Sequence, residues 1–125
     1  MGEGLNKKPY DLEERTFEYT KAVFSFINDC PKTAVNSVLV KQLIRSSSSV
    51  GANYIEAREA LSKKDFSMRI KICRKEVKES IYWLKLIEIK DNNAEKQRQS
   101  LIAESTELLK IFASIVEKVK EKSSK

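Results

Sequence analysis

The chain lacks histidine altogether, and its 125 residues include only two cysteines, two prolines and three glycines. Without histidine it has neither the commonest metal ligand nor the commonest general base, and the di-metal sites of helical bundles use Glu-x-x-His pairs. The spacing of Glu76 and Glu79 therefore does not indicate such a site. Cys30 and Cys73 lack metal-site spacing, and we expect free, partly buried thiols in a reducing cytoplasm. We expect no metal and no cofactor.

Long apolar runs are missing as well. No stretch approaches the roughly 20 residues that span a membrane, and residues 1–8 lack the apolar core of a signal peptide. The sequence also has no Gly-rich phosphate-binding loop and no Ser or Cys nucleophile beside a credible base, so we expect no enzyme activity. These absences predict a soluble cytoplasmic protein.

The scarcity of helix breakers, together with abundant Lys, Glu, Leu, Ile and Ser, predicts an all-α domain. Hydrophobic periodicity indicates helices at about 10–28, 34–61 and 63–90, and a fourth from the Asp91-Asn92-Asn93 cluster to about 120. Ser62 is the expected N-cap of the third helix, with Asp65 in the capping-box position. Short connections favour an antiparallel up-down-up-down four-helix bundle over 10–121, with flexible tails at 1–9 and 122–125.

The second predicted helix has unusual chemistry. Only three of the 22 residues in 36–57 are charged, in a chain that is 34% charged, so this helix should be covered on most sides. Yet helical spacing places polar residues on one of its stripes, namely Gln42, Ser46, Ser49, Asn53 and Glu56. Covered polar groups need hydrogen-bond partners, since each costs about 1–3 kcal/mol without one.

The third predicted helix offers partners for this stripe. Glu76 and Glu79 lie among apolar residues there, and Arg45 can present a bidentate fork to a carboxylate. We therefore predict a structural polar network that fixes the register of the two helices; its members are Gln42, Arg45, Ser49, Asn53, Glu56, Glu76 and Glu79. A partly solvated groove with ordinary ion pairs and a catalytic site are the alternatives.

An extra apolar strip runs along the third helix beside its core positions. It consists of Ile72, Trp83 and Leu86. Apolar surface beyond what one bundle interior needs usually indicates a partner, and a second copy is the commonest one. We predict a homo-oligomer interface on this strip, with a monomer that has a generous core as the alternative.

Positive charge is concentrated on the third predicted helix, which carries nine Lys and Arg residues against four acids. At 100° per residue, one arc of about 100° contains no acid. That arc holds Lys64, Lys71, Arg74, Lys75, Lys78, Tyr82 and Lys85. Segregated cations with an aromatic residue are typical of a polyanion-binding surface, so we predict contacts with nucleic-acid phosphates. The solvated outer face of an ordinary helix is the alternative.

Four segments together resemble a known family. They are QLIRS at 42–46, SVGANYIEA at 49–57, SKKDF at 62–66 and E-x-x-E-x-x-YWL at 76–84. They resemble the four-helix-bundle proteins named after intervening sequences of 23S ribosomal RNA genes, over about 11–112. The resemblance implies a ring-like homopentamer. It also implies kinship with the accessory variability protein of diversity-generating retroelements, a basic pentamer that associates with a reverse transcriptase and binds nucleic acid.

Two functional hypotheses follow. The first is a non-enzymatic, oligomeric RNA- or DNA-binding accessory protein that serves as a scaffold for a partner such as a reverse transcriptase. Its binding would follow shape and phosphate, because the sequence has no base-reading motif. The second is a purely structural protein–protein assembly module without a nucleic-acid ligand.

Overall fold

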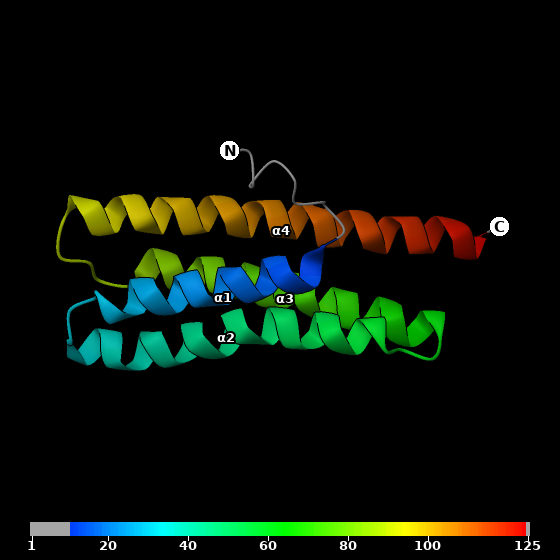
Figure 1. Cartoon of the computed structure of the whole chain (residues 1–125), viewed down its shortest axis with the longest axis horizontal. Helices are drawn as coiled ribbons and strands as arrows, with labels where there is room; N and C mark the ends of the chain where they lie inside the picture. The colour runs from blue at the N-terminus through cyan, green and yellow to red at the C-terminus, as the bar shows by residue number, and fades with distance from the viewer. Residues whose placement is uncertain (1–10, 125) are drawn as a thin grey trace.

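The computed structural model of the chain describes residues 11–124, with side chains to residue 122. Four helices form the described part: α1 (Leu12–Asn28), α2 (Ala34–Arg58), α3 (Lys63–Leu86) and α4 (Asn92–Ser124). Successive helices run in opposite directions (Figure 1). α2 packs against α1 and α3, and α4 closes the bundle against α3 and α1. α1 and α3 are therefore diagonally opposite, and the predicted all-α, four-helix class is confirmed.

Side-chain caps begin three of the helices. The Thr33 hydroxyl accepts a hydrogen bond from the Asn36 backbone N–H at 3.0 Å, and the Ser62 hydroxyl accepts one from the Asp65 N–H at 3.0 Å. An Asp91 carboxylate oxygen accepts from the Ala94 N–H at 2.9 Å. These caps satisfy amide groups that the first helical turn leaves without partners. The predicted N-cap at Ser62 is confirmed.

The helix ends differ from the predicted bounds. α2 ends at Arg58 rather than near Leu61, because Ser62 must be extended to cap α3 and the chain needs a turn before it. α3 ends at Leu86 rather than near Lys90, and α4 continues to Ser124, beyond the predicted end near Lys120. The predicted tail at 122–125 is thus helical as far as Ser124. The predicted start near Tyr10 and the tail at 1–9 lie outside the described residues.

Hydrogen bonds to side chains explain why α3 stops early. The Asn36 side chain donates to the Glu88 carbonyl and accepts from the Glu88 N–H, each at 2.9 Å. The Arg98 guanidinium donates to the Ile87 carbonyl at 2.7 Å. Because these partners replace helical hydrogen bonds, residues 87 and 88 leave the helix with their backbone groups paired.

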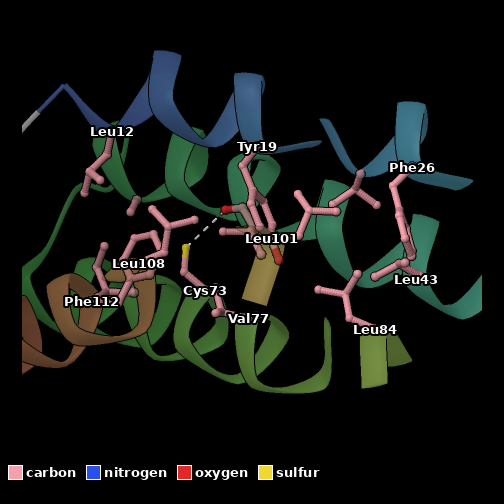
Figure 2. Close-up of a cluster of buried hydrophobic side chains, with 14 of the residues drawn as sticks. Leu12, Tyr19, Phe26, Leu43, Cys73, Val77, Leu84, Leu101, Leu108 and Phe112 are labelled. Carbon is pink, nitrogen blue, oxygen red and sulfur yellow. Dashed lines mark hydrogen bonds between the residues drawn. The ribbon is translucent and has the colours of Figure 1, made fainter. Parts of the chain in front are cut away.

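The core lies along the bundle axis and draws on all four helices. Figure 2 shows Leu12 and Tyr19 of α1 pointing toward Leu108 and Leu101 of α4, and Phe26 pointing toward Leu43 of α2 and Leu84 of α3. α2 and α3 complete it with buried residues that include Leu43, Val50, Ile70, Cys73, Val77 and Leu84. The burial of these side chains supplies most of the driving force for folding.

Small residues bring α1 and α2 close together. A Cβ atom added to Gly51 would lie 3.1 Å from the Thr16 hydroxyl oxygen, closer than ordinary contacts allow. The Thr20 hydroxyl donates to the Ser47 carbonyl across the same contact at 3.0 Å. Gly51 therefore serves a close helix–helix approach, and a side chain at this position would require Thr16 to shift by a few tenths of an ångström.

Candidate nucleic-acid interface

The basic stripe runs along the outer side of α3, away from the core. We use this name for the residues predicted to contact nucleic acid: Lys64, Lys71, Arg74, Lys75, Lys78, Tyr82 and Lys85. The five lysines and Tyr82 are exposed, whereas Arg74 is half-buried. With a rise of about 1.5 Å per residue, the stripe extends roughly 30 Å along the helix. The structure thus brings the predicted cations to one continuous surface.

The lysines of the basic stripe have no partner in the described part of the chain. Across residues 11–122, none of the five takes part in a side-chain hydrogen bond or ion pair. Five ammonium groups on one helix face repel each other mildly when no carboxylate lies among them. The stripe is therefore a surface whose charge has to be balanced by solvent ions or by an external polyanion.

Tyr82 gives the stripe an aromatic face. Its ring is exposed and meets the Trp83 ring edge-on, with centroids 5.1 Å apart and planes at 67°. The edge-on contact is a favourable geometry for aromatic pairs and holds the Tyr82 ring in place. An exposed aromatic ring among lysines can stack on an unpaired base.

The acids of α3 lie on its other side, at the seam with α2. Arg45 donates to Glu76 at 3.2 Å and to Glu79 at 2.6 Å, and its Nε is 3.5 Å from the Gln42 side-chain oxygen. The Glu76 side chain is only 8% exposed, whereas that of Arg45 is 50% exposed. The hydrogen bond from Arg45 to Glu79 is the largest of the influences that raise the pKa of Arg45. This cluster contains four of the seven residues of the predicted polar network.

A second polar cluster lies further along the α2–α3 seam. The Asn53 amide donates to the Ser49 hydroxyl and to the Ser49 carbonyl, both at 2.9 Å. Arg69 in turn donates to the Asn53 side-chain oxygen at 2.9 Å. The contact of Arg69 with Asn53 was not predicted, because Arg69 was counted only toward the net positive charge of the third predicted helix.

The structure corrects the expectation of one enclosed network. Its members form two clusters, and Glu56 is exposed without a hydrogen bond or ion pair among the described side chains. Gln42, Ser49 and Asn53 are half-buried and Arg45 is exposed. The polar stripe of α2 lies along the rim of the α2–α3 seam and mostly does not face the core. Water therefore reaches most of its residues.

Apart from the buried Glu76 carboxylate, the enclosed polar contacts are made by small or neutral side chains. Ser46 and Ser80 join α2 to α3 with hydroxyl oxygens 2.7 Å apart, and Tyr19 and Ser105 join α1 to α4 at 2.6 Å. Burial is the main cause that raises the pKa of Tyr19. Ser46 belonged to the predicted stripe; the pairing of the others carries no clear sequence signal, because serine is common on helix surfaces as well.

The predicted interface residues fall on the same side of α3 as the α2–α3 seam. Leu86 is 47% exposed, whereas Ile72 and Trp83 are half-buried and Trp83 packs against the core. The Trp83 indole N–H is buried and has no hydrogen-bond partner among the described residues. Leu86 thus offers most of the free apolar surface within this strip.

Three observations on the described residues concern metal binding, membrane insertion and thiol chemistry. Residues 11–122 contain no group of three or more Cys, Asp or Glu side chains placed to hold a metal ion. None of the four described helices combines the length and apolarity of a membrane-spanning segment. Burial raises the pKa of Cys73 to about 12, so its thiol is a weak nucleophile at neutral pH.

The fold and this surface define a class: a histidine-free four-helix bundle with a polar α2–α3 seam and a basic outer stripe. Comparison with known families narrows the class, because the model described as 23S rRNA-intervening sequence protein matches residues 9–114. The chain belongs to this family. A search of curated proteins found no match.

A solved structure agrees with this assignment. The chain is similar to a protein of unknown function from the S23 ribosomal protein family of Bacteroides thetaiotaomicron, whose crystal structure is known. The two share 31% sequence identity and superpose with a TM-score of 0.73. The match covers 83% of this chain and 96% of the other. Fold and sequence therefore support the same family.

Proposed function

We propose that the chain is a non-enzymatic, homo-oligomeric protein that binds RNA or DNA through the basic stripe of α3. The observation that carries the proposal is the set of five exposed lysines on one helix face that have no hydrogen-bond or ion-pair partner among residues 11–122. A phosphate backbone supplies negative charges along a line, and each phosphate that is neutralised releases a counterion. A straight stripe of point charges suits such a ligand.

The chemistry of the stripe favours recognition without sequence reading. Lysine ammonium groups contact phosphates as point charges, whereas base edges are read mainly by planar Arg, Asn and Gln side chains. Tyr82 can stack on any base. We therefore expect affinity that follows the shape and charge of the nucleic acid and that falls steeply as salt is added.

We further propose that the protein acts as a pentameric ring-like scaffold for a partner enzyme such as a reverse transcriptase. The resemblance to the accessory protein of diversity-generating retroelements suggests this partner. Exposed apolar side chains on α1, α2 and α3 support the assembly, since a lone subunit would leave them in water. A ring would repeat the basic stripe and raise its avidity for a long polyanion.

The second candidate is an assembly module without a nucleic-acid ligand. Val38 and Phe17, each 61% exposed, favour it, because surfaces of this kind serve protein contacts regardless of the lysines. Under this alternative the basic stripe is an ordinary solvated helix face, and no nucleic acid remains bound at physiological salt.

A charge-reversal experiment separates the two candidates. Lys71, Arg74, Lys75 and Lys78 are changed together to Glu, and binding to a fluorescent RNA 30-mer is followed by anisotropy. We expect binding to be lost, because the stripe then repels phosphates. The control changes Lys21, Lys96, Lys110 and Lys118 to Glu, which alters the net charge equally but spares α3. Circular dichroism checks the fold of both variants.

The control decides what the result means. Binding that survives in the control variant and disappears in the α3 variant supports a localised interface. Equal loss in both variants would indicate a net-charge effect only. If the wild-type protein binds neither RNA nor DNA at physiological salt, the assembly module is the candidate that remains.

A further inference from the structure

The outer face of α3 carries exposed apolar side chains as well as lysines. Three large ones are exposed on this helix: Met68 at 48%, Tyr82 at 58% and Leu86 at 47%. At 100° per residue, Met68 and Leu86 share one line of the helix about five turns apart, and Tyr82 lies about 40° from it. These three residues therefore form one row, roughly 27 Å long, which we call the apolar row.

The apolar row borders the basic stripe. A lysine of the stripe recurs at every seventh position of α3, at Lys64, Lys71, Lys78 and Lys85. Seven residues advance about 10.5 Å, so these lysines follow a nearly straight line that drifts by about 20° per step. That line lies roughly 40–100° around the helix from Met68 and Leu86, and Lys75 and Tyr82 stand between the two. α3 thus presents a cationic edge and an apolar edge side by side.

The charges beyond the apolar row, toward α2, would repel a phosphate backbone. The acids on this side are Glu56, Asp65, Glu79 and Glu88. Arg45 is engaged there by Glu79, to which it donates at 2.6 Å. Arg69 donates to the Asn53 side chain at 2.9 Å. A polyanion is therefore attracted to the lysine edge of α3 and not to the side that faces α2.

A single strand of nucleic acid has the same two-sided chemistry as this face. Its phosphates are anionic, and its unpaired bases offer apolar faces that stack on aromatic side chains. We propose that the ligand of the basic stripe is single-stranded RNA or DNA, with its phosphates on the lysines and its bases on the apolar row. The proposal rests on the nucleic-acid function proposed above, and it adds the class of ligand and its orientation on α3.

The straight line of lysines also favours a single strand over a duplex. The phosphates of a duplex wind around its axis in two rows, and the duplex resists bending over lengths of about 150 base pairs. A straight line of cations therefore meets each row only where the two cross. A flexible single strand can follow the line along its whole length. The stripe of roughly 30 Å accommodates up to about nine nucleotides if they stay stacked at ~3.4 Å each.

Tyr82 is the side chain best placed to stack on a base. Lys78 precedes it by four residues and Lys85 follows it by three, and both spacings place Cβ atoms about 5–6 Å apart on one helix face. A base on the Tyr82 ring thus has a cation near the phosphate on either side. Trp83 supports the ring, because it meets Tyr82 edge-on at 5.1 Å and itself packs against the core.

Matched oligonucleotides test the proposal on the full-length protein. The probes are a fluorescent 16-nucleotide single strand, the same strand paired with its complement, and a 16-unit abasic strand. All three carry phosphates, but only the first offers unpaired bases. Anisotropy at one salt concentration should show that the single strand binds about tenfold more tightly than either of the others, because each stacked base strengthens binding by about this factor.

Substitutions of Tyr82 test its role in choosing the single strand. Tyr82→Ala should weaken binding of the single strand about tenfold and leave binding of the abasic strand unchanged. Tyr82→Phe should bind like the wild type, because the ring that stacks is kept. Phe17→Ala is the matched control, since it removes an exposed aromatic ring from α1 and should change neither affinity. Circular dichroism checks the fold of each variant.

Trp83 supplies a spectroscopic readout of the stacked base. It is the single tryptophan of the chain, and its ring contacts Tyr82. At saturating concentrations, the single strand should change the Trp83 emission, whereas the duplex and the abasic strand should not. Contacts that involve phosphates alone would give the same emission with all three probes.

Three results would overturn the proposal. They are a duplex that binds as tightly as the single strand, an abasic strand that does so, and a Tyr82→Ala protein with wild-type affinity for the single strand. The proposed nucleic-acid function fails separately. Equal binding of all three probes, lost on charge reversal of the stripe, removes only the single-strand proposal. If none of the probes binds, both proposals fail.

Discussion

The two sides of α3 carry opposite charges, and they differ in whether those charges have partners within the described residues. On the side that faces α2, Glu76 and Glu79 both bond to Arg45. On the outer side, Lys71, Lys75 and Lys78 have no partner among residues 11–122. A charge enclosed between helices has to be matched within the chain, because burying it unpaired is costly. An exposed charge needs no internal partner and remains available for an external one.

The comparison predicts unequal effects of removing one cation from each side. Arg45→Ala should lower the free energy of unfolding by about 1–3 kcal/mol, because the buried Glu76 carboxylate loses its partner. The half-exposed position of Arg45 lets water replace part of the lost interaction, which keeps the cost below that of a fully enclosed pair. Lys78→Ala should change the free energy by less than about 0.5 kcal/mol.

Urea denaturation of the two variants checks this difference. Lys78→Ala is the matched control, since it removes one cation from the same region without breaking an ion pair. Equal, small effects of both substitutions would show that the α2–α3 seam is no better paired than the outer stripe.

The buried Cys73 thiol of α3 should also resist ionisation at alkaline pH. Burial raises the pKa of the Cys73 thiol from an ordinary 9.0 to about 12. In the folded protein the neutral thiol donates a hydrogen bond to the Val50 carbonyl at 3.3 Å. The unfolded chain therefore loses this proton first. The stability due to the neutral thiol is complete below pH 9 and falls as the pH rises from 9 towards 12, by up to about 1.4 kcal/mol per pH unit.

Cys73→Ala isolates this effect from other titrating groups. The difference in unfolding free energy between wild type and variant should shrink as the pH rises from 8.5 to 10.5. A difference that stays constant over this range would mean that the Cys73 thiol is accessible to solvent in the folded protein.

Much of the fold follows from sequence patterns. Apolar periodicity and few breakers identify four helices, and the Ser62 cap follows from local hydrogen-bonding chemistry. The early end of α3 could not be predicted in this way. It depends on Asn36 and Arg98, which reach residues 87 and 88 from other helices. Contacts between residues distant in the chain have no periodic signal.

Only part of the site could be predicted from the sequence, because some of its properties depend on one helix and others on how two helices pack. Helical periodicity placed the lysines of the basic stripe on one face, since that property depends on a single helix. The extent to which the polar stripe of α2 is covered depends on where α3 lies, so its exposure at Arg45 and Glu56 could not be judged from the sequence. The exposure of Val35 and Val38 was missed because α2 was expected to be covered on most sides.

The salt dependence of RNA binding tests the central claim most directly. Anisotropy titrations from 50 to 300 mM salt compare the wild-type protein with a Lys71→Gln, Lys75→Gln, Lys78→Gln variant. If these lysines contact phosphates, the variant binds more weakly, and its slope of log affinity against log salt is shallower by about two units, since each lost contact removes about 0.7. An identical slope and affinity in the two proteins would contradict the account.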